Sequence, residues 1–202
     1  AGCFYVHFPK CLIVSKNGSL EGQHFRKTGV LVSLSEQNLV DCSTKNHGCE
    51  GGVVIYAFAY IKDNGGLDTE KSYPYTHKEG ACHFDKNNVG ATVKDFVILP
   101  KGDENALKEA VATIGPVSVA IDSSQESFRN YKQGIYNEPN CTTEELGHAV
   151  LVVGYGTDGN GQDYWLVKNS WGTSWGDNGY IKMTRNQQNQ CGIATEASYP
   201  LV

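Results

Sequence analysis

His148 and Asn169 have the residue types and the surroundings of a pair that activates a thiol nucleophile. His148 opens one apolar stretch, and Asn169 begins the sequence Asn169-Ser170-Trp171, which closes another. A neutral imidazole accepts a proton from a thiol, and an amide oxygen bonded to its second ring nitrogen fixes its tautomer and orientation without adding charge. Trp171 and Trp175 are suited to shielding that hydrogen bond from water. A single histidine at a strand start is ordinarily structural, but the joint pattern predicts a site that needs a cysteine.

The elements that must position these residues change character along the chain. Helical patterns occupy residues 12–27, 37–42, 53–61 and 105–113. Ser33 and Glu36 have capping-box spacing before the second of these, and the third is apolar on all sides, which predicts a buried helix. Short runs rich in β-branched and aromatic residues predict strands at 117–121, 149–153, 164–167 and 180–183.

Helices followed by strands are typical of an α+β protein with two segregated lobes. We place the boundary near residues 95–102, which gives a helical lobe at 1–97 and a β-rich lobe at 98–202. A cleft between two such lobes is a natural place for a site.

Charge and hydropathy exclude two classes of partner. The net charge is −5 and no Lys/Arg stripe is present, which argues against nucleic-acid binding. No apolar run approaches the roughly 20 residues that a membrane span needs. The apolar start, AGCFYVHF, lacks a basic region and a cleavage pattern, so we do not expect it to be a signal peptide.

The seven cysteines indicate an oxidising compartment and disulfide bonds, although each could instead be a small buried apolar residue. The odd number leaves at least one thiol outside any intrachain pairing. Cys42, His47, Cys49 and the pair Cys82-His83 offer a metal site as an alternative, but their spacing does not match common zinc signatures. We therefore expect neither a metal nor a cofactor.

Eight stretches carry a family signature: LEGQ at 20–23, SLSEQNLVDC at 33–42, GCEGG at 48–52, SYPY at 72–75, GPVSVA at 115–120, GHAVLVVGYG at 147–156, YWLVKNSWG at 164–172 and CGIA at 191–194. In these stretches the sequence closely resembles the papain-like cysteine peptidases, and among them the cathepsin L group. The resemblance covers residues 15–202 almost without interruption.

This resemblance implies the papain-like two-lobed fold. The helical lobe would carry the thiol, an antiparallel β-barrel-like lobe would carry the histidine and asparagine, and the active site would lie in the cleft. Counting back without a gap from residue 20 places the nucleophile at Cys11. The family assigns His148 as general base and acid and Asn169 as its orienting residue. The implied activity is peptide-bond hydrolysis by an endopeptidase through an acyl-enzyme that water resolves.

The segment around Cys11 departs from the family pattern. The family glutamine that helps to hold the oxyanion falls on Tyr5, and loss of one such donor commonly costs about 100- to 1000-fold in turnover. Leu12 replaces an aromatic neighbour of the nucleophile, and Pro9 removes a backbone N–H. The alternative is therefore an inactive homologue that keeps the peptide-binding groove, or a truncated, misspliced or frame-shifted product in which residues 1–14 are foreign.

The resemblance also predicts the disulfides Cys42–Cys82 and Cys141–Cys191. The family partner of Cys49 falls on Phe8, which leaves Cys49 orphaned. Its only possible new partners are Cys3, which would spare the nucleophile, and Cys11, which would consume it.

The family's substrate groove falls on Gly51, Gly52, Val53, Val54, Ala120, Leu146, Ala149, Trp171 and Glu196. The glycines leave substrate backbone free to pair with main chain, and the apolar members suit a bulky aliphatic or aromatic residue two positions before the cut. Glu196, at the floor of that pocket, could pair with arginine, or could simply be a solvent-facing glutamate.

Asn17 and Asn140 stand in glycosylation sequons, and a glycan on Asn17 would conflict with the buried helix that the family has there. By family analogy we expect a lysosomal or secreted monomer. Its expected partners are peptide or protein substrates and, in addition, a propeptide or cystatin-like inhibitors.

Overall fold

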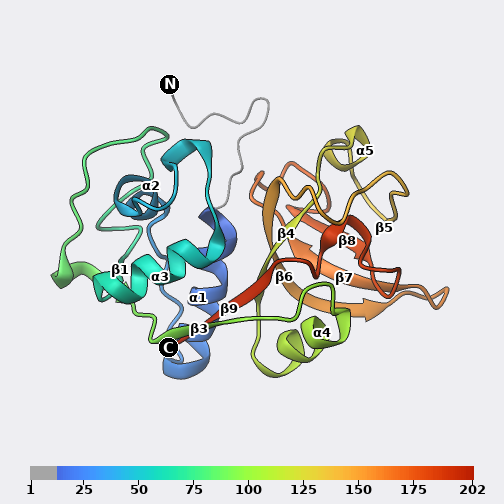
Figure 1. The fold of residues 1–202 in the computed structure, drawn as a ribbon, viewed down its shortest axis with the longest axis horizontal. Helices are drawn as coiled ribbons and strands as arrows, with labels where there is room; N and C mark the ends of the chain where they lie inside the picture. Colours follow the sequence, from blue (N-terminus) through green and yellow to red (C-terminus); the bar gives the residue numbers. More distant parts are fainter. Residues whose placement is uncertain (1–12) are drawn as a thin grey trace. The chain divides into compact units, whose positions relative to one another are not determined.

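The computed structural model describes residues 13–202, with side chains described from Asn17 onward, and confirms the α+β class (Figure 1). The chain divides into two compact units. The first comprises the chain up to Val97 together with Ser198–Val202, and the second is Ile98–Ala197. Among the described residues, no helix combines the length and apolarity that crossing a membrane requires.

Residues 198–202, which we expected in the second lobe, group with the first unit instead. They belong to β9 (Ala197–Leu201), which is a neighbour of β3 (Asp95–Ile98). The Lys94 N–H donates to the Leu201 carbonyl at 2.8 Å, which ties the end of the chain to the end of the first unit.

The first unit is built mainly from helices. Its other elements are α1 (Ile13–Thr28), α2 (Glu36–Cys42), the short 3₁₀ turn η1 (Gly48–Glu50), α3 (Val54–Asn64), β1 (Leu67–Asp68), η2 (Lys86–Asn88) and β2 (Val89–Ala91). β1 and β2 pair antiparallel. The core between these elements contains Leu20, Leu34, Leu39, Ala57, Ile61 and Leu67, all of which are buried.

The predicted helices α1 and α3 form, with two differences of detail. Ser35, not Ser33, caps α2, and its hydroxyl accepts the Asn38 N–H at 2.9 Å. Ser33 stays outside the helix because its carbonyl accepts the Glu70 N–H at 2.8 Å, in an extended segment. The expectation that α3 is buried on all sides is wrong, since Tyr56 is 42% exposed.

Three carboxylates gather where α2 begins. Burial, together with the nearby Glu70 and Glu21 carboxylates, raises the pKa of Glu36 to about 7. Glu70 Oε1 accepts the Tyr75 N–H at 2.9 Å, but its buried Oε2 receives no hydrogen bond from a protein N–H or hydroxyl in the described part. A protonated Glu36 hydrogen-bonded to Glu70 therefore satisfies the pair.

This pair predicts that the fold loses stability as the pH rises. The folded-state pKa of Glu36, about 7, lies above its ordinary 4.5, so the folded protein holds an extra proton between those values. Stability is then full below about pH 4.5 and falls by up to about 3 kcal/mol as the pH rises through 7. Urea melts from pH 4.5 to 7.5 should show this slope, and Glu36→Gln should flatten it. Glu50→Gln, at an exposed position, is the control and should keep the slope of the unmodified protein. If the unfolding free energy of Glu36→Gln falls just as steeply with pH, Glu36 is not the group responsible.

The second unit is built around a sheet. It contains α4 (Glu104–Thr113), β4 (Val117–Ile121), α5 (Glu126–Arg129), β5 (Ile135–Tyr136), β6 (His148–Thr157), β7 (Asp163–Lys168), β8 (Tyr180–Thr184) and η3 (Gln190–Gly192). Its strands lie in the order β4-β6-β7-β8-β5, as Figure 1 shows. The predicted strands and the helix α4 are all present. The sheet differs from the antiparallel expectation in one pair, because β5 runs parallel to β8.

Candidate active site

The antiparallel pair β6 and β7 brings His148 and Asn169 together. His148 is the first residue of β6, and Asn169 follows the last residue of β7. Leu151 lies opposite Lys168 in the register, so the start of one strand is beside the end of the other. His148 Nε2 and Asn169 Oδ1 are 2.8 Å apart, as the sequence pattern predicted for this pair.

A second hydrogen bond determines the tautomer of His148. The Ser170 backbone N–H donates to the same Asn169 Oδ1 at 2.7 Å. Because a backbone N–H can only donate, the atom that it meets must be the amide oxygen. Nε2 must then carry a hydrogen, and the lone pair of the neutral imidazole is on Nδ1. Nδ1 is therefore the nitrogen that can act as a base.

Aromatic rings surround this pair. The Trp171 ring lies 5.1 Å from the His148 ring, and the Phe128 ring meets His148 edge-on at 6.2 Å. Phe128 also contacts Trp171 at 5.5 Å and Trp175 at 5.2 Å. Trp171 thus covers the imidazole as expected, whereas Trp175 supports Trp171. Phe128, from the four-residue helix α5, is a supporting residue that the sequence analysis missed.

Burial sets the charge of the imidazole. His148 is 4% exposed and Asn169 is 5% exposed. Burial lowers the pKa of His148, because a charged ring would lose its hydration, and the hydrogen bond to Asn169 opposes this only in part. His148 is therefore neutral at neutral pH.

If the site has the peptidase activity that the resemblance implies, Asn169→Ala should cost catalysis more than folding. The variant removes the acceptor that holds the Nε2–H, and a hydrogen bond to a charged group is worth about 1.5–3 kcal/mol, so we expect kcat/KM to fall about 10- to 150-fold. Steady-state hydrolysis of a fluorogenic peptide measures this, with Asn160→Ala on an exposed turn as the control. Equal activities of the two variants would contradict the orienting role.

The chain's similarity to known proteins agrees with this geometry. The family model described as Papain family cysteine protease matches residues 9–201. The chain belongs to this family. The match begins at residue 9, earlier than the resemblance at residues 15–202 that the motifs support, and it includes Cys11.

Several relatives of this chain are cathepsins L. The chain is 67% identical over 198 residues to a cathepsin L of Sarcophaga peregrina and 55% identical over 197 residues to human cathepsin L2, covering 97% and 95% of this chain. A digestive procathepsin L 3 of Tenebrio molitor has the same fold, with a TM-score of 0.91, 48% identity and 95% of this chain covered. The chain spans only 58%, 59% and 62% of these three proteins, respectively.

The papain-family groove positions fall on both units. In the second unit, Ala120 lies opposite Ala149 in the β4–β6 register, and both are buried. The Ala120 N–H donates to the Glu196 carbonyl at 3.2 Å, while the Glu196 side chain is exposed. The Leu146 side chain lies against Gly192, and a Cβ at position 192 would overlap it. Ala120, Ala149 and Glu196 are thus neighbours in the second unit.

In the first unit, the expected groove positions are the turn before α3 and the first residue of that helix. Gly51 and Gly52 have φ values of 108° and 156°, which favour glycine. A Cβ on Gly52 would also overlap the Asn46 side chain, whose Oδ1 accepts the Val53 N–H at 2.8 Å. Val53 is 40% exposed, whereas Val54 is buried. Cys11 and Tyr5 lie outside the described residues.

The structure contains the disulfides Cys42–Cys82 and Cys141–Cys191, with Cα–Cα distances of 4.9 and 4.7 Å. Cysteine binds a metal through its thiolate. Because Cys42 and Cys82 are joined in a disulfide, they cannot be ligands of the metal site considered above. Cys49, which has lost its family partner, is disulfide-bonded, so it has one of the new partners that the sequence left open. The absence of the family's cysteine at position 8 did not leave it without a partner, and that partner lies outside the described residues.

The two sequons differ in accessibility. Asn17 is 1% exposed and donates its Nδ2–H to the Leu34 carbonyl at 3.0 Å, so a glycan at this nitrogen is incompatible with the fold. Asn140 is exposed in the loop before β6.

Proposed function

We propose that this chain acts as a cathepsin L-like cysteine endopeptidase with Cys11, His148 and Asn169 as its catalytic residues. The observation that supports it most is the 2.8 Å contact of His148 Nε2 with Asn169 Oδ1, which leaves the basic nitrogen Nδ1 available. The family match extends over Cys11, the nucleophile that the spacing predicts. Relatives at 67% and 55% identity are cathepsins L.

In the proposed mechanism, His148 Nδ1 takes the proton of Cys11 as the sulfur attacks the peptide carbonyl carbon. The imidazolium then gives this proton to the departing amine, and the acyl group stays on sulfur. Nδ1 next deprotonates a water that attacks the thioester, and the thiol is regenerated with its proton. Throughout, the Nε2–H stays bonded to Asn169, so the ring keeps its orientation.

Tyr5 takes the oxyanion position in this proposal. Its phenol can donate one hydrogen bond, but with a reach different from that of the family's glutamine. Hydrolysis of a Phe-Arg fluorogenic peptide tests the function directly, with Cys11→Ala as the inactive reference. Turnover that Cys11→Ala abolishes supports the proposal, and turnover equal in both proteins refutes it.

A non-catalytic, peptide-binding homologue is the second candidate. It is favoured by one observation: Cys49 is disulfide-bonded, and the only cysteines outside the two described bridges are Cys3 and Cys11. Under the enzymatic proposal Cys49 pairs with Cys3, and Cys11 keeps its thiol. Peptide mapping under non-reducing conditions separates the two cases, since a Cys11–Cys49 bridge would leave only the binding function.

We propose that the enzyme prefers a bulky apolar residue two positions before the cut, with arginine accepted through Glu196. The apolar side of this subsite would be formed by Val53, Val54, Ala120 and Leu146. Glu196→Ala should lower kcat/KM for an arginine at that position about 10-fold and leave a phenylalanine substrate unchanged. An unchanged ratio of the two kcat/KM values would exclude this role for Glu196. The control is Glu145→Ala, because Glu145 is exposed and precedes Leu146 in the sequence.

The same proposal extends to partners and location. The Tenebrio molitor neighbours are procathepsins, which supports association with a propeptide. Disulfides in both units support a lysosomal or secreted location. We expect a monomer that binds protein substrates and cystatin-like inhibitors.

A further inference from the structure

The Cys42–Cys82 disulfide joins one buried and one exposed cysteine. Cys42, at the end of α2, is 7% exposed, whereas Cys82 lies in the segment 76–83, in which every residue is exposed. The disulfide in the second unit is different, because Cys191 is fully buried and Cys141 is half-buried. Cys82 is therefore more exposed to a thiol in solution than either cysteine of the second bridge.

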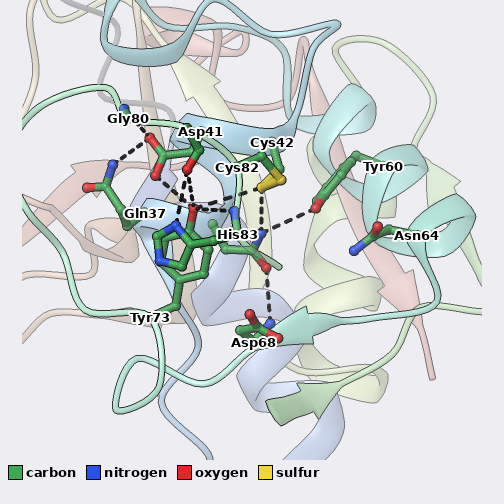
Figure 2. The surroundings of a disulfide bond; sticks show 12 residues. Gln37, Asp41, Cys42, Tyr60, Asn64, Asp68, Tyr73, Gly80, Cys82 and His83 are labelled. Atoms are coloured by element: carbon green, nitrogen blue, oxygen red, sulfur yellow. Dashed lines mark hydrogen bonds between the residues drawn. A yellow bond between two sulfur atoms is a disulfide. The ribbon is translucent and has the colours of Figure 1, made fainter. Parts of the chain in front are cut away.

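Figure 2 shows the surroundings of this bridge. The buried sulfur accepts a hydrogen bond from a side-chain amide. Asn38 Nδ2 lies 3.1 Å from Cys42 Sγ. The orientation of this amide is fixed, because Asn38 Oδ1 accepts the Asp68 backbone N–H at 3.1 Å. The amino group of Asn38 must then face Cys42 and the Tyr60 hydroxyl, which is 3.2 Å away. An N–H donor at this sulfur stabilises negative charge that develops on it.

The other polar groups near the bridge do not compete for this role. The Tyr73 hydroxyl is 4.0 Å from Cys42 Sγ, but it donates its proton to Asp41 Oδ2 at 2.8 Å. His83 stacks on the Tyr73 ring at 3.6 Å. Asp41 Oδ1 accepts hydrogen bonds from Gln37 Nε2 and from the Gly80 N–H, so its charge is already compensated on that side. Asn38 is thus the donor to Cys42.

The exposed segment is held by more than the disulfide. Gln37 Nε2 donates to the Lys78 carbonyl at 2.8 Å, and Gln37 Oε1 accepts the Thr76 N–H at 2.9 Å. Asp41 Oδ1 accepts the Gly80 N–H at 2.7 Å. These bonds come from α2, which also carries Cys42. Opening the disulfide would therefore leave the segment attached to α2, and the sulfurs of Cys42 and Cys82 would stay close together.

We propose that Cys42–Cys82 is a reversible thiol-exchange site, at which a small monothiol such as the tripeptide glutathione adds to Cys82. The incoming thiolate attacks Cys82 Sγ, a new S–S bond forms there, and the Cys42–Cys82 bond breaks with its electron pair going to Cys42. The Cys42 thiolate receives the Asn38 hydrogen bond and later takes a proton from water. Attack of that thiolate on the mixed disulfide reverses the reaction and releases the monothiol.

The test is the order in which the native protein reacts with reduced glutathione. After short exposures, remaining thiols are blocked by alkylation, and peptides are mapped by mass spectrometry. We expect glutathione to add to the peptide that contains Cys82 and the alkylating reagent to label Cys42. Both changes should occur at least about tenfold faster than any change at Cys141 or Cys191. Glutathione on Cys42, or equal rates at the two bridges, would overturn the proposal.

A pair of variants tests the part played by Asn38. Asn38→Leu removes the donor to Cys42, and we expect the opening rate to fall about tenfold. Tyr60→Phe removes the other partner of the same amino group without touching sulfur, and it should react like the unmodified protein. Equal rates for all three proteins would refute the role of Asn38. If Asn38→Leu does not fold, the order of reaction in the unmodified protein still decides the proposal.

Discussion

His148→Ala is expected to lower kcat/KM on the order of 10⁴-fold, because the variant has no group to take the proton of Cys11. The fold should survive, since the strands of its sheet keep their backbone pairing around position 148. Steady-state hydrolysis of a fluorogenic peptide measures the loss, and circular dichroism confirms that the variant is folded.

His47→Ala is the matched control, because His47 is exposed and belongs to the first unit. Its activity should equal that of the unmodified protein. A His148→Ala variant that keeps more than about a tenth of the activity would show that another group is the base.

Phe128→Ala is expected to cost about 3–5 kcal/mol of unfolding free energy. Phe128 is fully buried and its ring contacts Tyr136, His148, Trp171 and Trp175. The substitution leaves a cavity beside the imidazole, so kcat/KM should fall as well. Urea denaturation gives the free energy, and peptide hydrolysis in the folded range gives the activity.

Two further variants show whether the stability loss in Phe128→Ala comes from the packing of this ring or would follow the loss of any phenylalanine. Phe128→Leu keeps most of the volume and should cost markedly less than Phe128→Ala. Phe25→Ala removes a ring that is 50% exposed and should change stability by less than about 1 kcal/mol. A Phe128→Ala protein as stable as Phe25→Ala would contradict the supporting role of this ring.

The sequence predicted the elements whose patterns are local. The strands β6 and β7 carry short runs rich in β-branched and aromatic residues, and the residue pattern at their ends predicted the hydrogen bond between His148 and Asn169. The helix α1 formed despite Gly18 and Gly22, because its Leu20 is buried in the core of the first unit. Tertiary packing outweighs the helix propensity of two glycines.

Features that depend on distant contacts were out of reach. α5 has only four residues, too few for a helical period, so nothing in the sequence marked Phe128 as a core residue of the site. Ser33 and Ser35 both have the chemistry of a cap, and only the strand-like hydrogen bonding of residues 33–34 selects Ser35. The pKa of Glu36 depends on Glu70 and Glu21, which come from other segments.

The most direct test of the central claim is the reactivity of the Cys11 thiol in the native protein. Iodoacetamide labelling at a series of pH values, followed by peptide mapping, measures it. If His148 activates Cys11, the label should appear on Cys11 within the shortest exposures near neutral pH, and labelling should slow strongly in His148→Ala. Absence of label on Cys11, because of a bridge to Cys49, or the slow rate of an ordinary thiol in both proteins, would contradict the account.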